Sequence, residues 1–406
     1  MSSTGQSPAT QSVRWGLARH VIAATLARTV DGGGVVAVVL LVTTSGGSGW
    51  TAGLLGACLT LPHMVGPFVA RSLDVARDGR TVLAAACVLH GGLLAAAVLS
   101  YPFSWVGVPA VLLIASGVIG PLLTGGISSR LPAIAGPDLV AQRRAQGWDV
   151  ATYGIGGTIG PTVVAVVAAW TNATVAALVL AGGTLLAAFI VRLLPYAAPH
   201  GTDADVPHPV RTLQIITRTG ALRRTLYLTM IVALSVGVLP VTAVASAGLF
   251  GVEPATAGAL AACYGLGGLA GSVLVMIRPL RSDPDAAMPL LASLVAIALI
   301  GVLLAPGIWI AAAAYVTAGV LNSLFFAATL AARSEYSPLP VRGQVFVWVG
   351  ALKITAGSAG TAAAGALVAH TVQLPVALGA MLTALGVGLA VLDRRLSVPA
   401  ADQNTL

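Results

Sequence analysis

The chain has 406 residues, of which 57% are hydrophobic and 8% are charged, and its mean hydropathy is +0.93. Soluble domains use roughly 25% charged residues, so these values exclude water as the main solvent for the surface. The formal net charge is +8. Most arginines of the chain lie between apolar segments, where basic residues of membrane proteins collect on the cytoplasmic side. This placement explains the positive net charge without a nucleic-acid partner.

Twelve apolar segments follow one another, each about the 20 residues that a helix needs to cross roughly 30 Å of hydrocarbon. They cover residues 20–44, 50–72, 81–101, 105–129, 148–169, 173–195, 224–248, 254–277, 286–305, 308–332, 343–369 and 374–392. The first segment is no cleaved signal, because it is too long and because Arg28 and Asp31 interrupt it. We therefore predict an all-α integral membrane protein with twelve transmembrane helices.

Arginine is confined almost entirely to alternate gaps between these segments and to the two ends of the chain. These arginines are Arg14, Arg19, Arg71, Arg77, Arg80, Arg130, Arg143, Arg144, Arg192, Arg211, Arg218, Arg223, Arg224, Arg278, Arg281, Arg333, Arg342, Arg394 and Arg395. Intervening gaps such as 45–49, 171–172 and 305–307 contain no Lys or Arg. Because basic loops stay in the cytoplasm, the alternation predicts that both termini are cytoplasmic. The preference for Arg over Lys, beside many Ala and Gly residues, indicates a high-G+C bacterial genome and hence a bacterial plasma membrane.

The second apolar segment returns in the eighth. Residues 51–58 read TAGLLGAC and residues 256–263 read TAGALAAC, and the offset between later matches drifts from 205 to 198 residues. This repeat predicts two six-helix bundles in the same orientation, 1–195 and 224–406, joined by a cytoplasmic linker at 196–223. Parallel repeats of this kind place a solute site between the halves near the bilayer midplane and work by alternating access.

At this point the sequence resembles the major facilitator superfamily over essentially its whole length. In the fifth segment, Gly147, Gly156, Gly160 and Pro161 resemble the antiporter motif of the drug-efflux branches, although the closing Gly-Gly of the motif is Val-Ala here. Small residues let this helix approach a neighbour in the other half closely, and the proline bends it. Generic small-residue packing is the alternative interpretation.

The gap from Gly66 to Arg80 resembles a degenerate version of the cytoplasmic loop signature of the same superfamily. The resemblance implies that Asp74, Arg77 and Arg80 are gate residues, acting against the start of the eleventh segment near Arg342. A solvated charged turn is the alternative.

Three charged residues lie inside apolar segments. Arg28, Asp31 and Lys353, the only lysine in the chain, would each cost about 2.5–3.5 kcal/mol if they faced lipid. Arg28 and Asp31 are spaced i, i+3 on one helix face, so they are expected to pair locally. We hypothesise that Asp31 is the proton-coupling carboxylate and that Arg28 tunes it. The alternative is a fixed ion pair that only orients the first helix.

Several polar and aromatic residues are candidates for the solute cavity. Lys353 is either a counter-charge for Asp31 or the anchor for an anionic substrate, and His63 either titrates or is hydrogen-bonded within the bundle. The other cavity candidates are Tyr153, Tyr264, Asn322 and Phe325, with ordinary helix packing as the alternative for each. Asp149 is interpreted as an acid stabilised by the dipole of a helix N-terminus, with a structural role.

The sequence contains no nucleophile elbow, no His-Glu-x-x-His pair and no phosphate-binding loop. We therefore expect no enzyme, no catalytic or metal site and no cofactor. The predicted function is secondary active transport, as proton-coupled efflux of a drug-like or secondary-metabolite molecule. The alternative is proton-coupled uptake, or facilitated diffusion, of a polar nutrient. The expected partners are the small-molecule substrate, protons and the lipid bilayer, with no nucleic acid, and the protein is expected to be a monomer.

Overall fold

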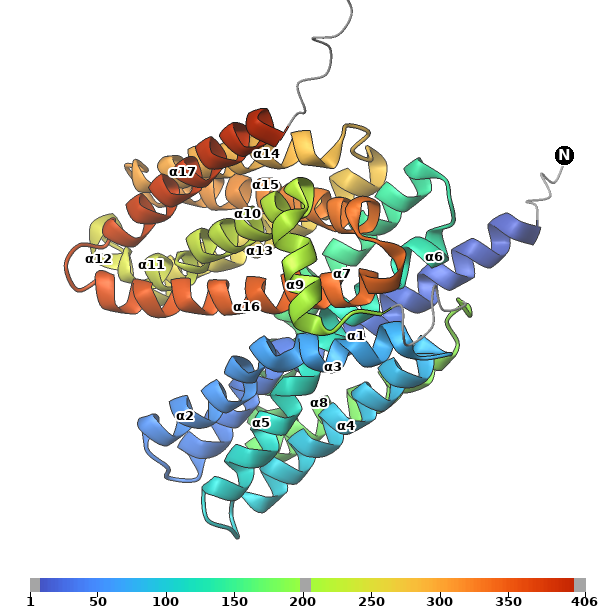
Figure 1. The fold of residues 1–406 in the computed structure, drawn as a ribbon. Helices are drawn as coiled ribbons and strands as arrows, with labels where there is room; N and C mark the ends of the chain where they lie inside the picture. Colours follow the sequence, from blue (N-terminus) through green and yellow to red (C-terminus); the bar gives the residue numbers. More distant parts are fainter. Residues whose placement is uncertain (1–7, 198–205, 398–406) are drawn as a thin grey trace, which may run out of the picture. The chain divides into compact units, whose positions relative to one another are not determined.

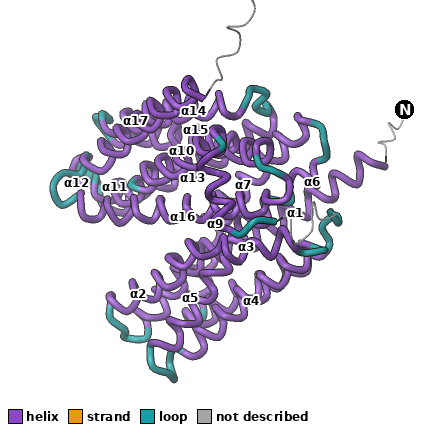
Figure 2. Tube along the Cα trace, viewed as in Figure 1, coloured by secondary structure: helices purple, strands orange, loops and turns teal. Residues whose placement is uncertain are grey.

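The computed structural model describes residues 8–197 and 206–397. Figure 1 traces the chain, and Figure 2 shows that the described residues form helices joined by loops, with no strand among them. Twelve helical spans in this part of the chain are long and apolar enough to cross a membrane. They are Trp15–Thr44, Trp50–Val75, Gly79–Ser100, Gly107–Ala135, Leu139–Trp170, Ala173–Arg192, Gly220–Ala245, Thr256–Ile277, Pro284–Leu303, Ile308–Tyr336, Leu339–Leu367 and Leu374–Leu396. The predicted all-α architecture with twelve spans is confirmed.

The start of a helix can differ from the start of its apolar segment when a capping residue fixes the first turn. The helix of the fifth span, α7 (Leu139–Trp170), begins nine residues before the apolar segment 148–169. Asp138 caps it, since its Oδ2 accepts a hydrogen bond from the backbone N of Ala141 at 2.7 Å. A cap of this kind satisfies backbone donors before the chain becomes apolar, so the helix extends beyond the membrane segment.

Contacts divide the chain into two units. The first unit is Met1–Pro209 with Pro338–Ala351, and the second is Val210–Ser337 with Leu352–Leu406. The first part of the predicted linker, at 198–205, lies outside the described residues. Beyond residue 205, the carbonyls of Pro207 and Pro209 accept hydrogen bonds from the side chains of Gln344 and Trp348.

The first unit contains the first six spans and the start of the eleventh. Its elements are α1 (Pro8–Thr44), α2 (Gly49–Thr60), η1 (Leu61–Val65), α3 (Gly66–Val75), α4 (Gly79–Ser100), α5 (Gly107–Pro121), η2 (Leu122–Gly126), α6 (Leu131–Ala135), α7, α8 (Ala173–Arg192), η3 (Leu339–Val341) and the first turns of α16 (Arg342–Leu367). Two interruptions matter for the site. Pro62 lacks a backbone N–H, and the second span tightens there to the 3-10 turn η1. After Pro121 the fourth span continues as the π-helical turn η2.

The second unit contains the remaining spans around one apolar core. Its elements are α9 (Pro209–Arg218), α10 (Gly220–Gly237), α11 (Leu239–Ala245), α12 (Ala247–Phe250), α13 (Pro254–Ile277), α14 (Pro284–Leu303), α15 (Ile308–Tyr336), the rest of α16 and α17 (Leu374–Ser397). Met288, Val295, Leu299 and Tyr315 are among the buried residues of that core.

Matching glycines support the internal repeat. A Cβ on Gly117 of α5 would lie 2.4 Å from the carbonyl oxygen of Leu59, and a Cβ on Gly319 of α15 would lie 2.1 Å from that of Tyr264. Leu59 and Tyr264 are 205 residues apart, the offset of the repeated segments. Both bundles therefore bring the same pair of helices into backbone contact at matched positions.

The glycines of the antiporter-type motif have a different partner from the expected one. Small residues of α7 were expected to face a helix of the other half. Instead, a Cβ on Gly160 would lie 2.3 Å from the carbonyl oxygen of Thr29, and one on Gly156 would lie 2.8 Å from the backbone of Arg28. These positions hold α7 against α1 within the first unit, while Gly147 is buried elsewhere on α7 and Pro161 lies inside that helix.

We predict that Gly160→Ala destabilises the protein, because the added methyl group would collide with backbone atoms of α1. Overpacking of this kind typically costs about 1–3 kcal/mol. Gly157→Ala is the matched control, since a Cβ there meets no atom within 4 Å. Thermal unfolding of the purified full chain should show a lower midpoint for the first variant only, and equal midpoints would contradict the packing described.

Candidate functional site

A buried ion pair joins α1 and α7 in the first unit. Arg28 Nη1 lies 3.1 Å from Asp149 Oδ1 and donates to the carbonyl oxygen of the same residue at 2.9 Å. Both side chains are almost completely buried, at 2% and 0% exposure. Arg28 therefore does not form the expected local pair with Asp31, because a buried carboxylate on the neighbouring helix takes its guanidinium.

Other donors complete the shell of Asp149. His20 Nε2 lies 2.9 Å from Asp149 Oδ1, and the hydroxyl of Ser128 donates to Oδ2 at 2.7 Å. A buried carboxylate needs such a set of donors to remain charged. Asp149 lies in the interior of α7, so its carboxylate is held by these side chains rather than by the dipole of a helix N-terminus.

The π-helical turn supplies an acceptor to the same cluster. Arg28 Nη2 donates to the carbonyl oxygen of Thr124 at 3.3 Å and to the Ser128 hydroxyl at 2.8 Å, and Nη1 also contacts the Thr152 hydroxyl. Tyr153 covers this guanidinium, whose Cζ lies 3.5 Å from the ring centroid. The structure therefore places Tyr153 against Arg28, as part of the ion-pair cluster.

Asp31 has a different partner, His63 of the 3-10 turn η1. His63 Nε2 lies 3.2 Å from Asp31 Oδ1, and the side chains are 1% and 25% exposed respectively. The imidazole packs against Gly120 of α5, where a Cβ would lie only 2.6 Å from Nε2. One turn earlier on α5, the Ser116 hydroxyl contacts His90 Nδ1 at 2.9 Å. Within its membrane-spanning helices, the first unit thus has a partly exposed carboxylate, Asp31, and two buried histidines, His63 and His90.

The expected gate acid, Asp74, caps the start of α16. Its Oδ1 accepts from the backbone N of Gly343 at 2.9 Å and its Oδ2 accepts from that of Gln344 at 2.8 Å. A carboxylate at a helix N-terminus satisfies free N–H groups and interacts favourably with the helix dipole. Asp74 and Arg342 also line one cavity of about 330 Å³ together with Arg130.

The other two expected gate residues have separate surroundings. Arg80 donates from Nε and Nη2 to Asp78 at 3.0 and 2.9 Å, and its Nη1 donates to the carbonyl oxygen of Leu194. These hydrogen bonds from Arg80 lower the pKa of Asp78 from 3.8 to about 2. Arg77 is exposed on the loop between α3 and α4. Asp74, by contrast, is held by the backbone amides of Gly343 and Gln344.

A cavity of about 410 Å³ lies within the second unit. Four of the expected cavity residues line it, namely Lys353, Tyr264, Asn322 and Phe325. The ammonium of Lys353 lies 3.4 Å from the ring centroid of Phe326, and Asn322 Nδ2 donates to the Tyr264 hydroxyl at 2.8 Å. The remaining expected cavity residues, His63 and Tyr153, have the partners described above in the first unit.

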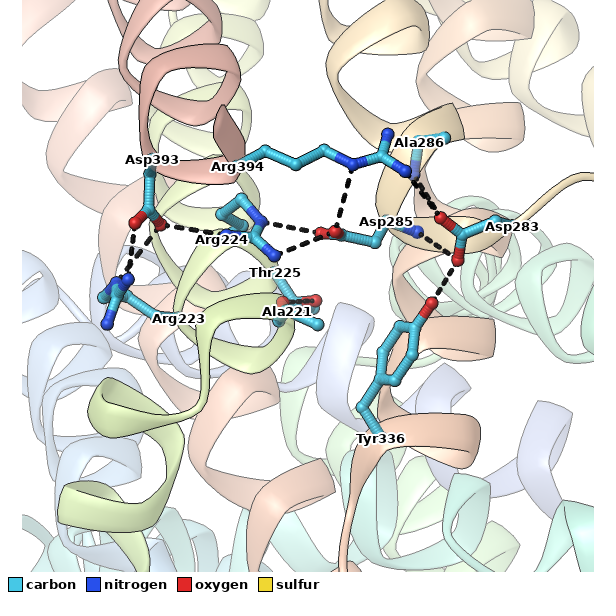
Figure 3. A network of polar contacts seen from close by, with 10 residues as sticks. All are labelled: Ala221, Arg223, Arg224, Thr225, Asp283, Asp285, Ala286, Tyr336, Asp393 and Arg394. Carbon is cyan, nitrogen blue, oxygen red and sulfur yellow. Dashed lines mark hydrogen bonds and ion pairs between the residues drawn. The ribbon is translucent and has the colours of Figure 1, made fainter. Parts of the chain in front are cut away.

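A further polar network joins α10, α14, α15 and α17 at their arginine-bearing ends (Figure 3). Its ionic and phenolic members are Arg223, Arg224, Asp283, Asp285, Tyr336, Asp393 and Arg394. Arg224 donates to both oxygens of Asp285 at 2.8 Å, in the bidentate geometry that is strongest for this pair. The network ties the ends of four helices together.

Among the described residues, no group of three His, Cys, Asp or Glu is arranged to hold a metal ion. No family model matches the sequence, and no curated protein matches it. Solved structures do match, over nearly the whole chain. A bacterial homologue of the iron transporter ferroportin is 13% identical with a TM-score of 0.75, and the match covers 94% of this chain and 99% of that one.

Two further structures match equally widely. The human organic anion transporter MFSD10 is 17% identical, with a TM-score of 0.69 and coverage of 95% and 100%. The major facilitator superfamily proton:xylose symporter XylE is 13% identical, with a TM-score of 0.69 and coverage of 96% of both chains. This chain has the major facilitator fold. At these identities the likeness concerns the fold alone. The candidate site must therefore be argued from the side chains of this chain.

Residues missed by the sequence analysis are His20, Ser128 and Thr152, with Asp149 recognised only as a helix-end acid. One signal was present: Asp149 lies inside an apolar segment and therefore needs a buried partner. The partner could not be chosen, because the two residues of the pair are 121 positions apart. In this structure α1 and α7 are neighbours, and that places Arg28 beside Asp149.

We predict that Arg28→Met strongly destabilises the protein, because it leaves the Asp149 carboxylate buried without its guanidinium. Breaking a buried pair from one side typically costs about 3–5 kcal/mol. The double variant Arg28→Met with Asp149→Leu should recover part of that loss in thermal unfolding. As a control, Arg394→Gln removes a 43% exposed partner and should cost no more than about 1 kcal/mol. Equal losses for the two single arginine variants would contradict the assignment.

Proposed function

We propose that the protein is a secondary active transporter that exports a drug-like or secondary-metabolite molecule in exchange for protons, by alternating access. The contact between Asp31 and His63 carries this proposal. It combines two titratable groups inside membrane-spanning helices, and the carboxylate is 25% exposed. Intramembrane ionisable residues are costly and mark proton or substrate pathways in transporters.

The neighbouring ion pair makes Asp31 available for this role. Arg28 is the nearest cation along α1, but its guanidinium is committed to Asp149, Ser128 and Thr124. Asp31 is therefore balanced by His63, whose charge depends on protonation. A proton taken up by this pair changes its net charge, and a conformational change that alters its exposure would release the proton on the other side. No enzymatic activity is proposed for any of these residues.

The cap of α16 serves as the proposed cytoplasmic gate. Asp74 on α3 holds two backbone amides of a helix that is distant in sequence. We assign Arg342 to the same gate through the cavity that it shares with Asp74. In this proposal, release of the Asp74 carboxylate from the α16 amides accompanies opening to the cytoplasm.

Proton-coupled uptake is the second candidate. It is favoured by one observation, that the proton:xylose symporter XylE shares this fold. The same proton pair would serve either direction, so the direction of substrate movement distinguishes the candidates. Protonophore-sensitive accumulation of a sugar or another polar nutrient would favour uptake, and protonophore-sensitive loss of dyes would favour export.

We predict that Asp31→Asn abolishes proton-driven transport while the protein is still made, because the amide keeps the shape but binds no proton. Efflux of a dye panel from cells, with and without a protonophore, measures this. His63→Gln should retain transport but change its pH dependence, since the hydrogen-bonding side chain no longer titrates. Asp138→Asn is the control, because Asn caps α7 about as well as Asp. Protonophore-sensitive efflux by the Asp31 variant at the normal rate would remove the coupling role.

We predict that Asp74→Asn opens the cytoplasmic side more often, because the neutral amide loses the charge that stabilises the start of α16. The dipole interaction is worth about 0.3–2 kcal/mol, or roughly a 2- to 30-fold shift. The probe is a cysteine at Ser129, which lines the same cavity as Asp74, in a background where the three native cysteines are replaced by serine. Its labelling by an impermeant maleimide in inside-out vesicles should become faster with Asp74→Asn and stay unchanged with Asp138→Asn. Unchanged labelling in both variants would argue against the gate.

A further inference from the structure

We propose that the cavity of the second unit binds the anionic group of its solute, so that the exported molecule is an organic anion with an apolar, ring-containing body. This inference deepens the proposed function and rests on it for the transport step. The binding step stands on the cavity alone and is tested separately below.

The positive charge of the cavity comes from Lys353. It is the only lysine in the chain, and it lies on α16, eleven residues past Arg342. Its ammonium lies 3.4 Å from the ring centroid of the buried Phe326, which holds the charge at the cavity wall by a cation–π interaction. A lysine ammonium has three donors on a flexible stem, and these suit it to bind a carboxylate or sulfonate.

Neutral donors lie beside this charge. Asn322 Nδ2 donates to the Tyr264 hydroxyl at 2.8 Å, and this leaves the phenolic proton of Tyr264 to be donated in turn. The Ser358 hydroxyl also lines the cavity and is exposed. A carboxylate accepts several hydrogen bonds at once, and hydrogen bonds to an ionised acceptor are about twice as strong as neutral ones. Lysine, tyrosine and serine donors in one cavity therefore fit an anion.

The remaining walls are apolar and match a ring-containing body. They are formed by Val232, Val236, Pro240, Phe325, Phe326 and Ile354. The volume of about 410 Å³ lies within the range of roughly 300–1,000 Å³ that is usual for small-molecule sites. Aromatic side chains gain from stacking on a planar solute, beyond the area that they bury.

The sign of the charge in this cavity selects against cations. None of the residues that line it is an aspartate or glutamate. The described acids of the second unit are placed elsewhere, at the helix ends and in loops, and they are Glu253, Asp283, Asp285, Glu335 and Asp393. A cationic solute would meet the like charge of Lys353, whereas a neutral solute would gain a weaker hydrogen bond from the ammonium than an anion does. The cavity therefore favours anions over both.

Anion export coupled to proton entry has an electrical consequence. Outward movement of a negative charge and inward movement of a proton both carry net positive charge inward. Each is driven by a membrane potential that is negative inside. Transport of an organic anion should therefore respond to an imposed potential even without a pH gradient.

The binding test compares acids with their own amides, so that only the charge differs. The probes are benzoate, 2-naphthoate and 1-pyrenebutyrate with the three corresponding amides, titrated calorimetrically into the purified full chain. We expect acids to bind about tenfold or more tighter than amides, which is the size of one charge-assisted hydrogen bond. The preference should vanish in Lys353→Gln and persist in Lys353→Arg. It should also persist in Arg278→Gln, which removes an exposed charge outside the cavity.

Several results would overturn the proposal. These are equal binding of acids and amides by the normal protein, a preference that survives in Lys353→Gln, and the failure of every acid to bind. Because Lys353 is the only lysine, reductive methylation followed by mass spectrometry gives a second readout at this residue. Acids should slow its methylation and amides should not. A lysine that does not react, or reacts equally in all cases, contradicts an open anion site. If acids bind as expected but no proton-dependent movement is found, the anion site stands and the proposed transport function fails.

Discussion

The rest of this structure depends on how ionised side chains are balanced inside apolar helices. A charged group at the centre of a helix that faces lipid costs about 2.5–3.5 kcal/mol, and a buried charge without a partner costs several kcal/mol more. Arg28 meets this constraint through Asp149, which His20 and Ser128 also hold. That choice decides the surroundings of Asp31, because its contact is then with His63 at 3.2 Å and not with Arg28. One fully buried pair, through Arg28, and one partly exposed pair, through Asp31, thus start from a single turn of the same helix.

The fold could be predicted from the sequence because its signals are long and repeated. Segments of about 20 apolar residues and arginines in alternate gaps are each read locally, and many of them must agree. The repeat of residues 51–58 in 256–263 was visible as an offset of 205 residues, and the structure adds that Gly117 and Gly319 pack against the carbonyls of Leu59 and Tyr264, which have the same offset. Errors arose at boundaries, where one side chain such as Asp138 decides where a helix begins.

The site could be predicted only in part, because its partners are distant in sequence. The i, i+3 spacing of Arg28 and Asp31 is a real signal of proximity on a helix, but a pair of this kind is worth only about 0.2–0.5 kcal/mol on an exposed surface. A buried carboxylate across the helix interface outweighs it. His63 was recognised as a titratable residue, but its partner depends on the tight turn after Pro62 and on the missing side chain at Gly120. Neither the turn nor the close approach is encoded in local periodicity.

The helix α16 carries both the backbone amides that Asp74 caps and the lysine of the second-unit cavity. It begins at the amides held by Asp74 and continues without interruption past Lys353. Lys353 lies ten positions after Gly343, which is about 15 Å at 1.5 Å per residue, or roughly half of the hydrocarbon thickness. In the proposed transporter, any coupling between the Asp74 cap and the ammonium of Lys353 runs along this one helix, and linkage makes such coupling reciprocal, so that a ligand whose binding depends on the cap also shifts the strength of the cap.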